Sequence, residues 1–341
     1  MINIRNISLF GGLFAIVVIA LGAWTRLVDA GLGCPDWPGC YGFVTFPTTD
    51  AEIALAESRY PMFPYEIDKA IPEVVHRYFA AMLGLIAIFL VFFAIRNNVD
   101  SSLRNLSIFL LFFICCQGLF GYLTVSLKLL PIIVTGHLFG GFITLSLFFF
   151  IFLKAADIKF LSYIDIRKYR YLALICLVVL LAQIFLGEWT STNYASLACP
   201  DFPTCQGSYY PEMDFESGFN LKQEVGPNYL YGLLENPARV AIHYSHRVTA
   251  LVLTFFMLIL IGCLWFTNAA PLSSTLGLVL LLQISLGIMN VVYVLPLYIA
   301  IAHNLIAAML LLVTLLVNYL SLIHISEPTR RRGISYAVFC L

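Results

Sequence analysis

The most regular feature of this chain is the alternation of long apolar runs with shorter polar segments. Eight runs each hold about 20 mainly apolar residues, the length that an α-helix needs to cross a bilayer core about 30 Å thick. We expect membrane-spanning helices at residues 8–28, 74–95, 105–126, 131–153, 171–190, 240–265, 273–294 and 297–319. The first run is long for a signal peptide and no Ala-x-Ala cleavage pattern follows it, so it counts as a helix. The pattern predicts an all-α integral membrane protein with eight transmembrane helices.

The second half of the chain repeats the first. Residues 21–42 align without a gap with residues 186–207, and twelve of the 22 aligned residues are identical. Three further pairs lie at shifts between 166 and 170: His76 with His246, His137 with His303, and Gln117 with Gln283. Each half holds four spans, an even number, so both halves have the same orientation and are related by a pseudo-twofold axis along the membrane normal. The repeat predicts two tandem four-helix bundles, at residues 1–160 and 161–319.

The charged residues are few and unevenly placed. They make up 11% of the chain with a net charge of zero, against about 25% in soluble domains, and no basic stripe indicates a nucleic-acid partner. With a cytoplasmic N-terminus, the segments on that side carry eight basic residues: Arg5, Arg96, Arg104, Lys154, Lys159, Arg167, Lys168 and Arg170. By the positive-inside rule, the long loops at 29–71 and 192–238 are external. We expect a multi-pass protein of the cytoplasmic (inner) membrane with both loops on the periplasmic side.

The last 22 residues, 320–341, do not resemble the rest of the chain. LSLIHISEPTR at 320–330 and ISYAVFCL at 334–341 resemble translated sequencing-adapter ends. We interpret 320–341 as a non-native tail, and its histidine, cysteine and arginines are left out of the functional reasoning. The true C-terminus beyond about Tyr319 is therefore unknown.

Four of the remaining histidines form two repeat-related pairs inside the predicted spans. His76 and His137 belong to the first half, and His246 and His303 hold the same places in the second. A single buried histidine often only bonds to a neighbouring helix, but intramembrane ionisable residues usually face the bundle interior and serve a function. Two imidazoles from separate helices can bind a heme iron from opposite faces, whereas zinc needs more ligands than each pair offers. The duplicated pairs therefore favour two heme sites.

The halves differ beside their first histidine. Glu73 stands three residues before His76, whereas His243 stands three residues before His246, and such neighbours share a helix face. Glu73 could approach whatever His76 binds, although Pro72 and Glu73 also look like an ordinary helix start. The difference suggests a carboxylate that manages protons in one half and a permanent heme for electron transfer in the other, with His243 as a supporting residue.

An arginine directly follows each first histidine. Arg77 comes after His76 and Arg247 after His246. These side chains are candidates for contacts with heme propionates, and snorkelling to the membrane interface is an equally good interpretation.

The ordered set of motifs resembles the heme A synthase family of cytochrome oxidase assembly proteins, over about residues 8–319. The motifs are Gly22-x-x-Thr25-Arg26, CPDWPGC at 34–40, Glu73-x-x-His76-Arg77, Thr135-Gly-His137, CPDFPTC at 199–205, His246-Arg247 and His303. The resemblance implies an oxidoreductase that converts the C8 methyl of heme O to the formyl of heme A by successive hydroxylations. It also implies heme O synthase and an electron-transfer protein as partners, and a homo-oligomer is an open alternative to a monomer.

The resemblance also implies roles for single residues. His76 and His137 would ligate the iron of the substrate, heme O, in the N-terminal half, with Glu73 essential beside them. His246 and His303 would ligate a heme b cofactor in the C-terminal half.

Each external loop carries a pair of cysteines six positions apart in the sequence. The resemblance implies two disulfides, Cys34 with Cys40 and Cys199 with Cys205. A loop with two thiols and no histidine lacks the four ligands of zinc and the Cys-x-x-Cys-His of c-type heme attachment, and an external compartment is oxidising. Each loop leaves the helix before a heme-ligand helix, so we expect it to cap a heme pocket. The first pair, above the substrate site, could also be redox-active.

Three other functions share part of the pattern. A diheme b-type electron-transfer protein, such as a quinone oxidoreductase, would need both histidine pairs but not Glu73 or a substrate-sized pocket. A membrane thiol oxidase would use the cysteine pairs and leave the histidines unexplained. A transporter would account for the parallel repeat alone.

Overall fold

A computed structural model describes residues 3–156 and 166–323, and all its regular elements are helices. Eight of the described helices are long and apolar enough to span a membrane, which confirms the eight predicted spans. They are α1 (Ile4–Leu27), α3 (Ile67–Arg96), α4 (Ser101–Ser126), α5 (Pro131–Ala155), α6 (Arg170–Thr192), α8 (Asn236–Trp265), α9 (Ala270–Val292) and α10 (Leu297–Ile323). The short helices are α2 (Asp50–Arg59), the 3-10 turn η2 (Arg167–Tyr169) and α7 (Phe215–Gly218).

Local sequence signals set several helix ends. Asn3 caps α1 by accepting a hydrogen bond from the amide of Arg5, and Asp100 caps α4 in the same way. Proline occupies the first turn of α5, α8 and α9, where its missing N–H costs no helix bond.

The interpretation of Pro72 and Glu73 as a helix start is wrong. The third helix begins at Ile67, so Pro72 lies inside it. The carbonyl of Pro72 accepts a hydrogen bond of 3.1 Å from the hydroxyl of Thr25 on α1. The apolar run marks only the part of α3 suited to the bilayer core, and the helix continues for several residues beyond that part.

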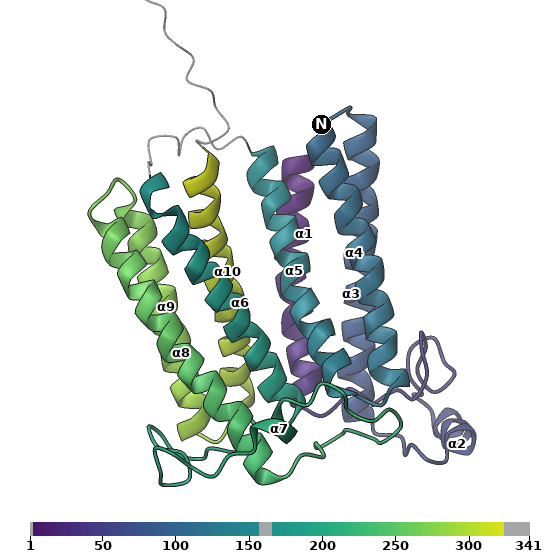
Figure 1. The fold of residues 1–341 in the computed structure, drawn as a ribbon. Helices are drawn as coiled ribbons and strands as arrows, with labels where there is room; N and C mark the ends of the chain where they lie inside the picture. The colour runs from purple at the N-terminus through teal and green to yellow at the C-terminus, as the bar shows by residue number, and fades with distance from the viewer. Residues whose placement is uncertain (1–2, 157–165, 324–341) are drawn as a thin grey trace, which may run out of the picture.

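The long helices pack as two groups of four (Figure 1). In the N-terminal group α1 packs on α3 and α5, and α4 packs on α3 and α5 from the other side. In the C-terminal group α6 packs on α8 and α10, and α9 packs on the same two helices. The groups meet where α5 packs on α6 and α1 on α10. This arrangement is consistent with two tandem bundles.

The surface of the helix bundle is apolar on its outer side as well as in its core. Phe10, Phe112, Phe255 and Leu251 are each more than half exposed on membrane-spanning helices. Such side chains suit contact with lipid, as expected of a multi-pass membrane protein.

Both cysteine loops, with α2 and α7, lie at one end of the bundle, opposite the N-terminus (Figure 1). Of the suspected tail, residues 320–323 complete α10, and Leu320 and Ser321 are buried. Residues 324–341 and Lys159 lie outside the described residues.

Candidate functional site

The first histidine pair lies inside the N-terminal group, toward the end that carries the cysteine loop. His76 on α3 and His137 on α5 face each other with their ring centroids 6.3 Å apart and their planes at 87°. Both line a cavity of about 840 Å³, a volume within the usual range of ligand sites. The Nδ1 atom of each ring is buried and has no hydrogen-bond partner among the described residues. The structure thus brings two predicted site residues together at one cavity.

The second pair lies at the equivalent place in the C-terminal group. His246 lies on α8 and His303 on α10, the helices that correspond to α3 and α5 in the repeat. The side-chain amide of Gln183 lies 3.1 Å from Nδ1 of His246, and that of Gln283 lies 3.3 Å from Nε2 of His303. The repeat pointed to Gln283 but gave no signal for Gln183, whose counterpart in the first half is Val18.

A glycine on a neighbouring helix borders each of the four histidine rings. A Cβ atom on the glycine would lie only 3.0 to 3.3 Å from Cε1 of the ring. The pairs are Gly22 with His76, Gly121 with His137, Gly187 with His246, and Gly287 with His303. A larger residue would push the ring from its place, so these glycines set the ring positions. The four glycines occupy repeat-related positions, as expected if both histidine pairs bind a similar ligand.

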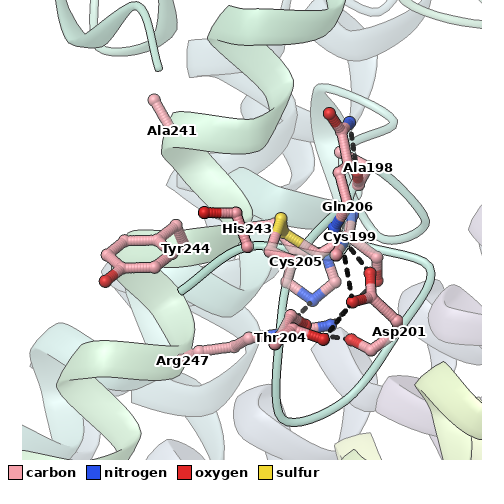
Figure 2. Close-up of a disulfide and its surroundings, with 12 residues drawn as sticks. Ala198, Cys199, Asp201, Thr204, Cys205, Gln206, Ala241, His243, Tyr244 and Arg247 are labelled. Atoms are coloured by element: carbon pink, nitrogen blue, oxygen red, sulfur yellow. Dashed lines mark hydrogen bonds between the residues drawn. A yellow bond between two sulfur atoms is a disulfide. The ribbon is translucent and has the colours of Figure 1, made fainter. Parts of the chain in front are cut away.

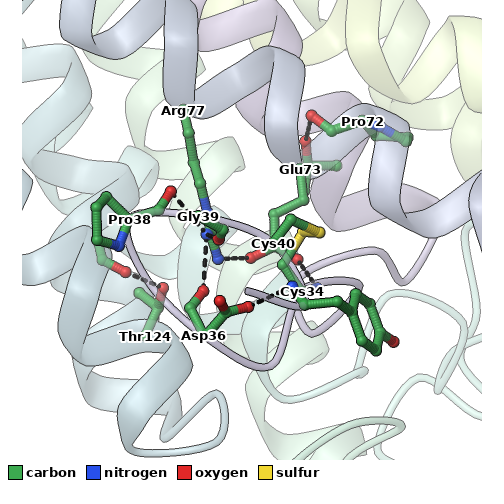
Figure 3. A network of polar contacts seen from close by, with 12 residues as sticks. Cys34, Asp36, Pro38, Gly39, Cys40, Pro72, Glu73, Arg77 and Thr124 are labelled. Atoms are coloured by element: carbon green, nitrogen blue, oxygen red, sulfur yellow. Dashed lines mark hydrogen bonds and ion pairs between the residues drawn. A yellow bond between two sulfur atoms is a disulfide. The ribbon is translucent and has the colours of Figure 1, made fainter. Parts of the chain in front are cut away.

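Glu73 is a buried carboxylate that connects the first histidine pair to the first cysteine loop. It is only 4% exposed and lines the cavity. One carboxylate oxygen accepts a 2.8 Å hydrogen bond from the amide of Cys34, and the other forms an ion pair with Arg77 (Figure 3). Both oxygens are therefore held in place within the helix bundle, one turn from His76.

His243 takes the place of Glu73 in the C-terminal half. Its Nδ1 lies 3.4 Å from the amide nitrogen of Cys199, and its Nε2 lies 3.3 Å from Nε of Arg247. A neutral imidazole accepts a hydrogen bond at only one of these two nitrogens. The imidazole therefore supports the loop as the carboxylate does in the other half, without its negative charge. This agrees with the interpretation of His243 as a supporting residue.

Arg77 and Arg247 are directed at the cysteine loops. Nη1 of Arg77 donates to the carbonyls of Asp36 and Gly39 at 2.8 and 2.6 Å. Arg247 donates to the carbonyls of Cys199, Asp201 and Thr204 at 2.8 to 2.9 Å (Figure 2). Each guanidinium group thus anchors a loop, a role that the sequence did not predict; contact with heme propionates remains a prediction.

The two cysteine loops have the same internal structure. Disulfides join Cys34 to Cys40 and Cys199 to Cys205, with Cα atoms 4.7 and 4.5 Å apart. In the first loop the carboxylate of Asp36 accepts hydrogen bonds from the amides of residues 41 and 42. In the second, Asp201 accepts from the amides of residues 206 and 207. The last of these residues is a glycine with positive φ in both loops, which explains its presence in the repeat.

Asp201 in the second cysteine loop and Tyr41 in the first both have a shifted pKa. The hydroxyl of Thr204 and the amides around Asp201 lower the pKa of that carboxyl, because they stabilise its charged form. Burial, with a smaller effect of the Glu66 charge, raises the pKa of Tyr41 to about 12. Tyr41 therefore stays neutral at physiological pH and donates its hydroxyl to the carbonyl of Pro64.

The first loop covers the mouth of the cavity. Asp36, Trp37, Pro38 and Gly39 all line it. The ring of Trp37 packs edge-on against Tyr122 of α4, with the centroids 5.7 Å apart. This placement matches the expected cap over the pocket.

Two polar residues that the sequence motifs did not single out line this cavity from the other half of the chain. They are Glu188 on α6 and Asn304 on α10. A signal existed for Glu188, an isolated acidic residue in an apolar run at the place that Ala23 holds in the first half. Only the packing of the two groups reveals that both face the N-terminal cavity.

Nearly the whole chain is similar to proteins of one known family. The family model described as COX15-CtaA, cytochrome oxidase assembly protein, matches residues 5–315. The heme A synthase of Shewanella oneidensis is 42% identical over 320 residues, which cover 93% of this chain and 96% of that protein. The heme A synthases of Neorickettsia sennetsu and Rickettsia massiliae are 25% and 27% identical, covering 88% of this chain and 93% and 92% of their own lengths.

Proposed function

The chain belongs to the COX15-CtaA family of cytochrome oxidase assembly proteins, and on that premise we propose that it converts heme O to heme A. The reaction oxidises the C8 methyl group of the porphyrin to a formyl group. Two successive hydroxylations give a geminal diol, and loss of water from the diol leaves the aldehyde. The proposal rests on the duplicated histidine pair. A glycine borders each of the four histidine rings, and the first pair lines a large cavity.

We assign the substrate to the N-terminal half, residues 1–160. His76 and His137 would hold the iron of heme O, because they face each other across the cavity. The cavity is mainly apolar, which suits the porphyrin and its isoprenoid tail. The cysteine loop above it limits access of water to the reacting edge of the substrate.

We assign a resident heme b to the C-terminal half, residues 161–319, with His246 and His303 as its iron ligands. When bound, this cofactor supplies one-electron transfer. Gln183 and Gln283 contact the two rings and would fix their orientation.

Glu73 is the residue of this chain best placed to handle protons at the substrate site. Its carboxylate lines the cavity and is held between the Cys34 amide and the Arg77 guanidinium. Oxidation of a methyl group releases protons, and a fixed carboxylate can accept them. In the C-terminal half His243 occupies this position, which supports a role in electron transfer alone for that half.

The membrane setting and partners follow from the same proposal. The protein would lie in the inner membrane with its N-terminus in the cytoplasm and its cysteine loops on the periplasmic side. A heme O synthase would supply the substrate, and a separate electron-transfer partner would exchange electrons with heme b.

The proposal is tested by expressing the protein with a source of heme O in a host that makes no heme A of its own. Extracted hemes are separated by chromatography, and heme A is expected in cells with the wild-type protein. A folded, heme-loaded protein that leaves heme O unchanged would instead indicate a diheme electron carrier.

A further inference from the structure

Two polar side chains of the C-terminal half lie in the substrate cavity of the N-terminal half. Glu188 on α6 and Asn304 on α10 line it together with His76 and His137. Each is adjacent in sequence to a residue of the C-terminal site. Gly187, which borders the His246 ring, precedes Glu188, and His303 precedes Asn304. On both helices, consecutive residues therefore belong to the two different sites.

The described residues leave acceptor atoms of both side chains without a hydrogen-bond donor. Glu188 is 5% exposed and receives no hydrogen bond from the described residues; the charge that acts on it is the guanidinium of Arg26. The Oδ1 atom of Asn304 is buried without a partner in the described part of the chain. Leaving buried polar groups unpaired is costly, so a bound molecule that donates hydrogen bonds here would recover that cost.

The polar pair breaks the repeat. Ala23 stands where Glu188 would be in the first half, and Leu138 stands where Asn304 would be. The equivalent apolar residues offer nothing to a polar group. Ala23 and Leu138 line the same cavity as Glu188 and Asn304, so only the C-terminal half contributes a polar side chain at these two repeat positions.

A carboxylate oxygen and an amide oxygen both accept hydrogen bonds, so their natural partner is a hydroxyl group. Heme O carries one on its hydroxyethylfarnesyl chain, and the first oxidation creates another on the carbon of the C8 methyl group. We propose that Glu188 and Asn304 form a subsite, contributed by the C-terminal half, that accepts a hydrogen bond from a hydroxyl group on the porphyrin edge.

This inference rests on the proposed function, and its test compares binding with product composition. The variants are Glu188→Ala, Glu188→Gln and Asn304→Leu, with Asn290→Leu as the control. Asn290 also has a buried, unpartnered Oδ1 atom but does not line the cavity. Heme O and protoheme, which lacks the hydroxyethylfarnesyl group, are titrated into each purified protein, and the hemes formed in cells are separated by chromatography.

Two results support the subsite and distinguish the hydroxyl it binds. If it binds the side-chain hydroxyl, Glu188→Ala weakens heme O binding at least about tenfold and leaves protoheme binding unchanged. If it binds the new C8 hydroxyl, heme O binding is unchanged but the hydroxymethyl intermediate accumulates several-fold over wild type.

The resident heme spectrum reports folding independently of both measurements. If Glu188→Ala does not fold, Glu188→Gln and Asn304→Leu provide the same two readouts. Wild-type binding and product composition in the folded variants would overturn the subsite. Failure of the wild-type protein to make heme A would instead count against the proposed function, and the binding comparison would still decide the subsite.

Discussion

The phenol of Tyr194 donates a hydrogen bond of 2.8 Å to the carboxylate of Asp29, its own counterpart in the other half, 165 residues away. Beside it, the guanidinium of Arg26 lies 4.0 Å from the centroid of the Tyr194 ring and donates to the carbonyl of its own counterpart, Ser191. Residues at equivalent positions can meet only close to an axis that relates the halves. These contacts therefore join the two halves near that axis, beside the cysteine loops.

The Asp29–Tyr194 contact should couple the stability of the two halves. We expect Asp29→Asn and Tyr194→Phe each to destabilise the detergent-purified protein. The double variant should lose less unfolding free energy than the sum of the two single losses. The expected coupling is about 1 kcal/mol, as for one partly buried hydrogen bond. Thermal unfolding of the four proteins measures it, and strictly additive effects would show that the contact joins nothing.

Glu73→Gln should separate heme binding from conversion. The amide keeps the shape of the side chain but cannot take up a proton at neutral pH, so we expect heme A formation to fall at least about 100-fold. The heme content of the purified protein should stay near that of wild type. The matched control is His243→Gln in the other half, which should reduce heme A formation far less. Equal heme A output from Glu73→Gln and wild type would remove this carboxylate from the mechanism.

The first disulfide should act as a structural clamp on the cap. Closing so short a loop contributes only about 2 kcal/mol in the chain-entropy model, and Arg77 and Asp36 also hold the loop. We therefore expect a Cys34→Ala/Cys40→Ala protein to unfold at a lower temperature but still form heme A when kept cold. Complete loss of conversion in a folded, heme-loaded double variant would mean that the thiols themselves take part. The Cys199→Ala/Cys205→Ala protein is the matched control.

The cap should weaken at high pH because of Tyr41. Its pKa is raised to about 12 in the folded protein, against about 10 in an unfolded chain. A raised pKa means that the neutral phenol stabilises the fold below pH 10 and that this stability is lost as the pH rises from 10 to 12. Proteolysis of the first loop should thus accelerate over that range. In Tyr41→Phe the rate of proteolysis should no longer rise between pH 10 and 12. If the rise persists in that variant, another group causes it.

Much of the fold could be predicted because single segments determine it. Each apolar run is long enough to require a membrane helix by itself, and the repeat shows His76 and His303 to be members of pairs. The start of α3 could not be predicted, because hydropathy does not report helical turns beyond the bilayer core. The places of Glu188 and Asn304 could not be predicted either, since they depend on how α6 and α10 pack against the other half.

If the two halves perform different roles, two matched histidine variants should differ in the hemes that they contain. His137→Ala and His303→Ala are each expressed with a source of heme O, purified, and their hemes extracted and separated by chromatography. We expect His137→Ala to keep its heme b and make no heme A, and His303→Ala to lose its heme b. Heme A formation by His137→Ala, or full retention of heme b by His303→Ala, would contradict the assignment.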